Sequence, residues 1–356
     1  MSHAHHRLGR GLSQWVESSR SMNSRRQFVW GSLCSCLPPF AGGQSAPSVP
    51  VDSGRGRPAS GGSVVETVRL LGVPLRSGSL YPGSENDAKG YRDAGLVDVL
   101  RRAGNQVVDD GDLEIPSYLP HHSIPPIRNW PGPRIVWDLA RLRVAQYLEH
   151  ADHLPVLLGC DCSIVVGTAQ ALSNAGDVHV IYIDGDFDDA PPEATTTRSG
   201  AALAVWLLTN ESPFCSRPLT PEKVSVVGWT NGPFAGSTKV GSISLKEIRE
   251  RGRGEAIQSL LQRIPQRTKI LVHLDIDAVR QSDLPAAYFP HTEGLSLEEA
   301  GEMLDTVLTD ERVRLIEISE YAALRDADGQ SAVKIAGLLA HALDQRRARR
   351  LHDSKP

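Results

Sequence analysis

Residues 178–190 have the sequence VHVIYIDGDFDDA and contain a strand that ends in a cluster of carboxylates. With one exception, residues 178–182 are apolar or β-branched, a pattern typical of a strand buried on both faces of a parallel sheet. Asp184, Asp186 and Asp188 follow at a spacing of two, so they project to one side while the chain stays extended. Like charges this close repel unless a cation binds them. The stretch therefore predicts a divalent-metal site with hard oxygen ligands at the end of a strand.

A second acidic strand lies at residues 269–277, whose sequence is KILVHLDID. Its alternation places His273, Asp275 and Asp277 on one face, with the histidine one pleat deeper than Asp275. We therefore interpret His273 as a structural residue rather than a metal ligand. The carboxylates of this strand also lie at its far end, where an open α/β sheet holds its site.

The rest of the chain alternates between strand-like and helix-like segments. Further strands are expected at residues 67–73, 106–109, 154–158, 223–228 and 313–318. Helices are expected at residues 91–103, 135–150, 164–174, 199–209, 245–262, 296–308 and 332–346. Ser244 with Glu247, and Ser296 with Glu299, have the spacing of helix capping boxes. This alternation predicts an α/β fold, a three-layer α/β/α sandwich with a mostly parallel central sheet.

Composition indicates a globular protein, with 40% hydrophobic and 22% charged residues. No run of about 18 apolar residues is present, so we expect no transmembrane helix. Residues 1–46 hold five of the 38 Lys and Arg and one of the 42 Asp and Glu, so the remainder carries a formal charge of −8. That charge argues against nucleic acid as a partner and leaves a small-molecule substrate as the expectation.

The amino terminus has the features of an export signal. Residues 24–29, SRRQFV, fit the twin-arginine pattern, and residues 29–41 are weakly apolar. Residues 44–46, QSA, offer a small-residue cleavage site, and Cys36 lies in a loose lipoprotein-like box. We expect export to the periplasm or the exterior; the alternative is a disordered basic tail on a cytoplasmic protein. The expected organisation is a leader at 1–46, a Gly/Pro/Ser-rich linker at 47–63, a folded domain at 64–348 and a tail at 349–356.

Three strand ends carry the motifs GCDCS, DGDFD and HLDID, at residues 159–163, 184–188 and 273–277. In this order they resemble the arginase/agmatinase (ureohydrolase) family, whose patterns are GGDHS, DxHxD and SxDxD. The resemblance covers most of residues 66–345, and IEIS at 316–319 is similar to the family's VEVN segment. It implies two Mn²⁺ ions whose field lowers the pKa of a shared water, giving a hydroxide that attacks a guanidinium carbon. It also implies a homo-oligomer.

Carried over by position, the resemblance implies metal ligands and catalytic residues. Asp184, Asp188, Asp275 and Asp277 match the family's four carboxylate ligands, and Asp277 is also expected to act in catalysis. Glu317 matches the acidic residue that pairs with the substrate's guanidinium.

Three positions depart from the family. Cys162 and Asp186 stand where the family has its two His ligands, and Ser199 stands where a catalytic His precedes Gly. The expected metal ligands are therefore Cys162, Asp184, Asp186, Asp188, Asp275 and Asp277, and the expected catalytic residues are Glu317, Asp277 and Ser199. This shell is more anionic than the family's, which disfavours a bound hydroxide. The carboxylates favour Mn²⁺ or Mg²⁺ and the thiol favours Zn²⁺; we expect Mn²⁺. Alternatively, Cys162 is only a small buried residue.

The sequence thus predicts a metal-dependent hydrolase that cuts a C–N bond of a guanidino, amidino or related amide compound other than arginine. The main alternative is a non-catalytic protein of the same fold that binds a metal or a ligand. An EF-hand is disfavoured because position six of DGDFDD is Asp189 rather than Gly. A phosphatase of the haloacid-dehalogenase kind also has a strand followed by an Asp motif, but it does not explain GCDCS.

Overall fold

The computed structural model describes residues 65–353 apart from 123, 235 and 237. The predicted leader at 1–46, the linker at 47–63 and the last three residues of the predicted tail lie outside the described residues. Within the described part, no helix combines the length and the apolar character needed to cross a bilayer.

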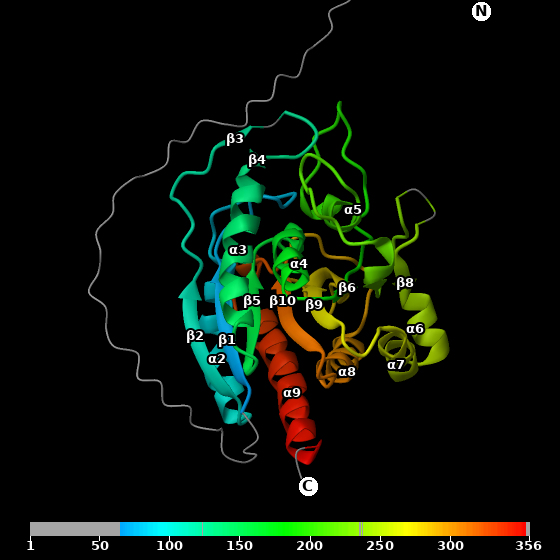
Figure 1. Ribbon diagram of the computed structural model, residues 1–356. Coiled ribbons are helices and arrows are strands. Elements are labelled where there is room, and N and C mark those ends of the chain that lie inside the picture. Colours follow the sequence, from blue (N-terminus) through cyan, green and yellow to red (C-terminus); the bar gives the residue numbers. More distant parts are fainter. Residues whose placement is uncertain (1–64, 123, 235, 237, 354–356) are drawn as a thin grey trace, which may run out of the picture. The chain divides into compact units, whose positions relative to one another are not determined.

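The centre of the fold is an eight-stranded sheet with the order β2-β1-β5-β10-β9-β6-β7-β8 (Figure 1). Its strands are β1 Thr67–Val73, β2 Gln106–Asp112, β5 His153–Gly159, β6 Val178–Ile183, β7 Val224–Val227, β8 Gly241–Ile243, β9 Lys269–Asp275 and β10 Val313–Ser319. Every described pairing in this sheet is parallel, which confirms the predicted sheet. A separate antiparallel pair joins β3 His121–His122 to β4 Trp130–Pro131.

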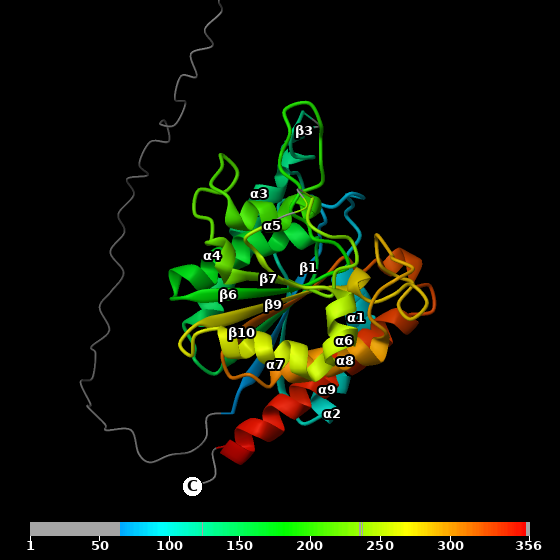
Figure 2. The same cartoon turned by 90° about the vertical axis from the view of Figure 1, so that its right-hand side faces the viewer.

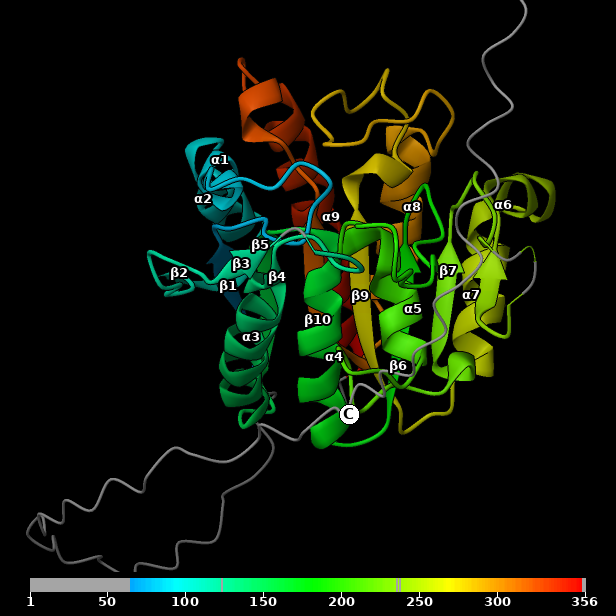
Figure 3. The ribbon, with the colours of Figure 1, turned by 90° about the horizontal axis from the view of Figure 1, so that it is seen from above.

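Helices cover both faces of the sheet, so the predicted three-layer sandwich is confirmed (Figures 2 and 3). One face carries α3 Gly132–Leu148, α4 Val165–Asn174 and α5 Ala204–Thr209. The other carries α1 Asp87–Asp93, α2 Leu96–Arg102, α6 Leu245–Arg251, α7 Arg253–Arg263, α8 Leu297–Leu308 and α9 Gln330–Asp353. Each helical layer packs on its face through a separate apolar core, as expected when helices lie on both sides of a parallel sheet.

Several boundaries differ from the sequence prediction for local reasons. The helix predicted at 91–103 is interrupted at Gly95 and the one at 245–262 at Gly252, because a positive φ (80° and 91°) breaks the helical repeat. Helix α9 continues to Asp353, into the segment predicted as tail. Strand β8 was not predicted, because three residues are too few to show a period. Both predicted capping boxes, at Ser244 and Ser296, are present.

Candidate metal centre

Four neighbouring strands bring the sequence motifs to one edge of the sheet. In the order β5-β10-β9-β6, these strands end in or just before GCDCS, IEIS, HLDID and DGDFD. Register aligns Ser319 with Asp275 and Glu317 with His273. Because all four strands run parallel, their carboxyl ends converge, and the polar residues that follow them share one site.

Three carboxylates at this edge are almost completely buried. Asp184, Asp275 and Asp277 are 1%, 3% and 4% exposed, and each offers an oxygen within 4.8 Å of the others. Burial raises the pKa of Asp184 well above its usual range, and Asp188, Asp277 and Asp275 raise it further through charge repulsion. Among the described residues, no Lys or Arg forms an ion pair with Asp184, Asp275 or Asp277. Without a Lys or Arg paired to them, these carboxylates can be ionised together only if a further cation joins the cluster.

Cys162 extends the cluster toward β10. Its Sγ lies 2.8 Å from Asp275 Oδ2, 4.0 Å from Asp184 Oδ2 and 3.2 Å from Ser319 Oγ. Burial first, and then Asp275 and Asp184, raise the pKa of the Cys162 thiol well above its usual range. Without a cation the thiol stays protonated and donates a hydrogen bond to Asp275. A soft cation would displace the proton and bind the sulfur.

Asp188 and Asp186 hold the outer part of the cluster. Tyr182 Oη donates to Asp188 Oδ2 at 2.6 Å, and Asn231 Nδ2 donates to Asp186 Oδ1 at 2.6 Å. Burial acts to raise the pKa of Asp186, but the nearby His291 imidazole and the hydrogen bond from Asn231 outweigh it and lower that pKa. The structure thus brings together all six residues that the sequence predicted as ligands, with Asp186 at the half-exposed side.

His291 was missed by the sequence reasoning. Its Nε2 lies 3.3 Å from Asp186 Oδ2 and 3.6 Å from Asp277 Oδ2. Asp186 first, and then Asp277, raise the pKa of His291 to about 10. The residue lies in the loop after HLDID, outside any strand or helix, so no periodicity marked it; a histidine soon after an acidic motif was the available signal.

The cluster lies at the floor of a cavity of about 330 Å³. Its walls include Ser199, which is buried and accepts a hydrogen bond from Ala202 N at 3.3 Å, and the aromatic rings of Tyr288 and Phe289. This volume suits a small molecule.

Glu317 lies one pleat below the cavity and does not line it. Its Oε2 lies 2.8 Å from His273 Nδ1, and His273 Nε2 lies 3.1 Å from Ser319 Oγ. The imidazole also stacks on Tyr182, with ring centroids 4.5 Å apart.

The carboxylate that does line the cavity is Glu320, which accepts a hydrogen bond from Ser79 Oγ at 3.3 Å. The next acidic residue along the chain, Glu320, is therefore the one that faces the cavity.

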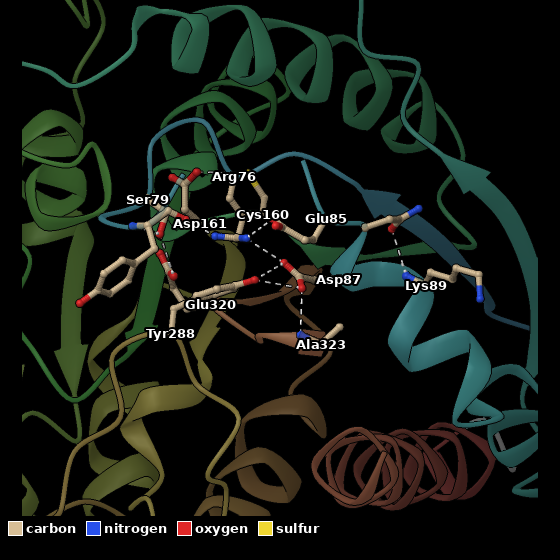
Figure 4. A network of polar contacts seen from close by, with 12 residues as sticks. Arg76, Ser79, Glu85, Asp87, Lys89, Cys160, Asp161, Tyr288, Glu320 and Ala323 are labelled. Carbon is tan, nitrogen blue, oxygen red and sulfur yellow. Dashed lines mark hydrogen bonds and ion pairs between the residues drawn. The ribbon is translucent and has the colours of Figure 1, made fainter. Parts of the chain in front are cut away.

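A second buried carboxylate beside the cavity has a cation from the chain itself (Figure 4). Arg76 Nε donates to Asp87 Oδ2 at 2.8 Å, and Arg76 Nη2 donates to Glu85 Oε2 at 2.6 Å. The Arg76 guanidinium also lies over the Tyr288 ring, 3.6 Å from its centroid. Asp87 accepts from Ala323 N at 2.9 Å as well, so its oxygens are fully occupied by protein groups.

Comparison with known proteins identifies the family. A model of the arginase family matches residues 66–344. The chain belongs to the arginase family. The arginase of Brucella melitensis is 24% identical over 296 residues, which cover 77% of this chain and 95% of the relative. The fold is shared with Entamoeba histolytica arginase in complex with L-ornithine (TM-score 0.68, 19% identity, 80% and 98% coverage). It is also shared with Trypanosoma cruzi formiminoglutamase with Mn²⁺ (0.62, 18%, 80% and 94%).

By the match to the family motifs, this chain lacks two histidine donors. Cys162 and Asp186 stand at the two positions where the family motifs carry histidine, and both lie in the cluster described above. The donor set still fits a divalent cation, because buried carboxylates, a thiol and an imidazole converge without an opposing Lys or Arg from the described chain. The carboxylates of the arginase-family motifs therefore lie together in a cluster that could hold a divalent cation with an altered set of donors.

Proposed function

We propose that this arginase-family protein is a divalent-metal-dependent hydrolase that cuts a C–N bond of a small linear amidine or related amide. The observation that carries the proposal is the set of buried, mutually repelling carboxylates Asp184, Asp275 and Asp277 at the floor of a small-molecule cavity. Burying these carboxylates together is destabilising unless a cation occupies the cluster. The presence of the cluster therefore supports a function for that cation.

A bound divalent metal would supply Lewis acidity and a water of lowered pKa. The cluster carboxylates and Cys162 would hold it, with Mn²⁺ favoured by the number of oxygen donors. Tyr182, by donating to Asp188, fixes the orientation of that carboxylate. Ser199 supplies a hydroxyl at the cavity wall but, unlike a histidine, cannot protonate a leaving amine near neutral pH. We therefore propose slow turnover.

The substrate side of the cavity supports a compound other than arginine. Glu317 is engaged by His273 below the cavity, and Glu320 is the acidic group on the cavity wall. We propose that Glu320 pairs with the cationic amidine group of the substrate. One protein that shares the fold is named as a formiminoglutamase, an enzyme acting on a formimino compound, and this supports the same class of bond here.

The test combines metal analysis with an assay. Purified protein incubated with Mn²⁺, Zn²⁺ or Mg²⁺ should retain metal by mass spectrometry, and Asp275→Ala should lose it. Urea and ammonia release should be measured with arginine, agmatine and guanidinobutyrate. A variant with Cys162→His, Asp186→His and Ser199→His should raise any guanidino hydrolysis by about 10²-fold or more, since a general acid or base contributes about 10²–10⁴-fold. Rapid wild-type hydrolysis of arginine would contradict the proposal on the substrate.

The replacement of the catalytic histidine by Ser199 favours one alternative, a binding protein that uses the same cavity without catalysis. Metal retention with no turnover of any amidine by either the wild type or the triple variant would support that alternative.

We also propose export through the twin-arginine pathway, on the SRRQFV sequence of the leader. Conversion of Arg25 and Arg26 to Lys should keep the protein in the cytosol. Fractionation that finds the wild type there with its leader intact would contradict this proposal.

A further inference from the structure

We propose that His291 is a metal ligand, which binds through Nε2 together with Asp186 and Asp277 and supplies an imidazole from a different part of the chain than the family motifs do. The inference rests on the proposed metal centre but not on hydrolysis. In the family motif the imidazole belongs to the position of Asp186, whereas here it comes from the loop that follows β9.

The geometry of the three donor atoms suits a shared cation. Two ligand atoms that each lie about 2.1 Å from one ion are about 3.0 Å apart at a right angle and about 3.4 Å apart at the tetrahedral angle. His291 Nε2 lies 3.3 Å from Asp186 Oδ2 and 3.6 Å from Asp277 Oδ2. Both separations exceed those of a well-formed N–H···O hydrogen bond and are near the spacing that ligands of one ion require.

In the described structure, His291 Nε2 has only long contacts with the carboxylates of Asp186 and Asp277. His291 is 12% exposed at its side chain, and its Nε2 is a buried atom that no hydrogen bond of good geometry satisfies. Buried polar atoms are normally satisfied, and an unsatisfied one that points at two carboxylates indicates a missing partner. A cation at the centre of the three donor atoms would satisfy all of them.

The backbone around His291 is arranged to admit its ring. A Cβ placed on Gly185, in the DGDFD motif, would lie 2.7 Å from His291 Cδ2, which is closer than real Cβ atoms approach, and 3.0 Å from Asp277 O, which is tighter than most Cβ contacts. Glycine at this position therefore leaves room for the ring beside the cluster. The loop is held from the other side, because Gln281 N donates to His291 O at 2.7 Å and Phe289 packs edge-on against the ring.

The charge of the cluster gives the imidazole a distinct role. Cys162 and five aspartates would surround the metal with anionic donors, and replacing both family histidines removed two neutral ones. His291 adds a donor without adding negative charge, so it limits the rise in the pKa of bound water that extra carboxylates cause.

The experiment detects the nitrogen directly. Full-length wild-type protein loaded with Mn²⁺ should show ¹⁴N modulation in its electron spin-echo signal. His291→Gln should lose the modulation and bind Mn²⁺ at least about tenfold more weakly, as expected for a group that holds a metal or its ligands. The matched control is His341→Gln, because His341 also lies beside an aspartate, with Nε2 3.2 Å from Asp305 Oδ2, but its side chain on α9 is 61% exposed. It should keep both properties.

Two further variants sharpen the assignment. Gly185→Ala should displace the ring and weaken the modulation, and Asp186→His in the His291→Gln protein should restore it by returning an imidazole to the family position. Bound Mn²⁺ without nitrogen modulation in the wild type overturns the inference even if His291→Gln does not fold, and leaves the metal centre standing. A wild type that binds no divalent metal overturns both this inference and the proposed function.

Discussion

Asp87 and the carboxylate cluster of Asp184, Asp275 and Asp277 are both buried, with Asp87 behind the cavity residue Tyr288, but they differ in their partners. Asp87 is 1% exposed and is paired with Arg76, which is itself 3% exposed. Asp184 and Asp275 are as deeply buried, yet no Lys or Arg of the described chain is paired with either. Since a buried charge needs a partner, folding supplies one for Asp87, whereas Asp184 and Asp275 could be ionised together only with a further cation beside them. A protein cation therefore accompanies Asp87 and not Asp184 or Asp275, and this difference can be tested by mutation.

The largest effect is expected from breaking the structural pair. Asp87→Ala leaves the Arg76 guanidinium buried beside Tyr288 without its main partner, so the free energy of unfolding should fall by about 3–5 kcal/mol. Urea denaturation measures the change. Asp93→Ala, on the same helix α1, is the matched control: its pair with Lys89 is exposed, and its loss should cost less than about 1 kcal/mol. Equal losses in the two variants would show that burial does not distinguish these pairs.

The next effect concerns the unpaired cluster. A divalent metal that binds only the folded protein at about 100 times its dissociation constant should raise the free energy of unfolding by about 2.7 kcal/mol. Thermal or urea unfolding with and without Mn²⁺ measures this, and a chelator should reverse it. Asp87→Asn should retain the metal effect, whereas Asp275→Asn should lose it, because only Asp275 belongs to the cluster. An Mn²⁺ effect that survives Asp275→Asn would place the ion elsewhere.

The sequence predicted the part of the carboxylate cluster that depends on local strand patterns. Alternation in DGDFD and HLDID places Asp184, Asp275 and Asp277 at strand ends, and parallel strands bring those ends together. The sequence did not show that Glu320, rather than Glu317, lines the cavity, because which of the two does so depends on where the chain leaves β10. Glu320 follows the last strand residue with a φ of 58°, which redirects the chain there, and no alternation pattern carries that information.

His291 and Arg76 were not predicted for a related reason. Both act through contacts with residues brought close only by folding: Asp186 for His291, and Asp87 and Tyr288 for Arg76. Motif spacing describes neighbours along a strand, whereas loop residues reach a site through tertiary packing. A family motif that lacks its usual histidines is thus a reason to search the loops around the site for replacement donors.

The smallest effect is expected in the metal-free protein. Asp275→Asn removes one of the repelling carboxylates while keeping a side chain of the same size, whose Oδ1 can still accept from Asp277 N and whose Nδ2 can donate to Cys162 Sγ. The metal-free variant should therefore be more stable than the metal-free wild type, by about 1 kcal/mol, the free energy of roughly one pKa unit of interaction. Urea denaturation in the presence of a chelator measures the difference. The same substitution should be destabilising relative to wild type once Mn²⁺ is present, because only the wild type gains the metal's stabilisation. The change in unfolding free energy caused by Asp275→Asn should thus reverse sign when Mn²⁺ is added, as expected if a metal ion offsets the repulsion in the cluster. A variant that is less stable in both conditions would mean that Asp275 is structural, as Asp87 is.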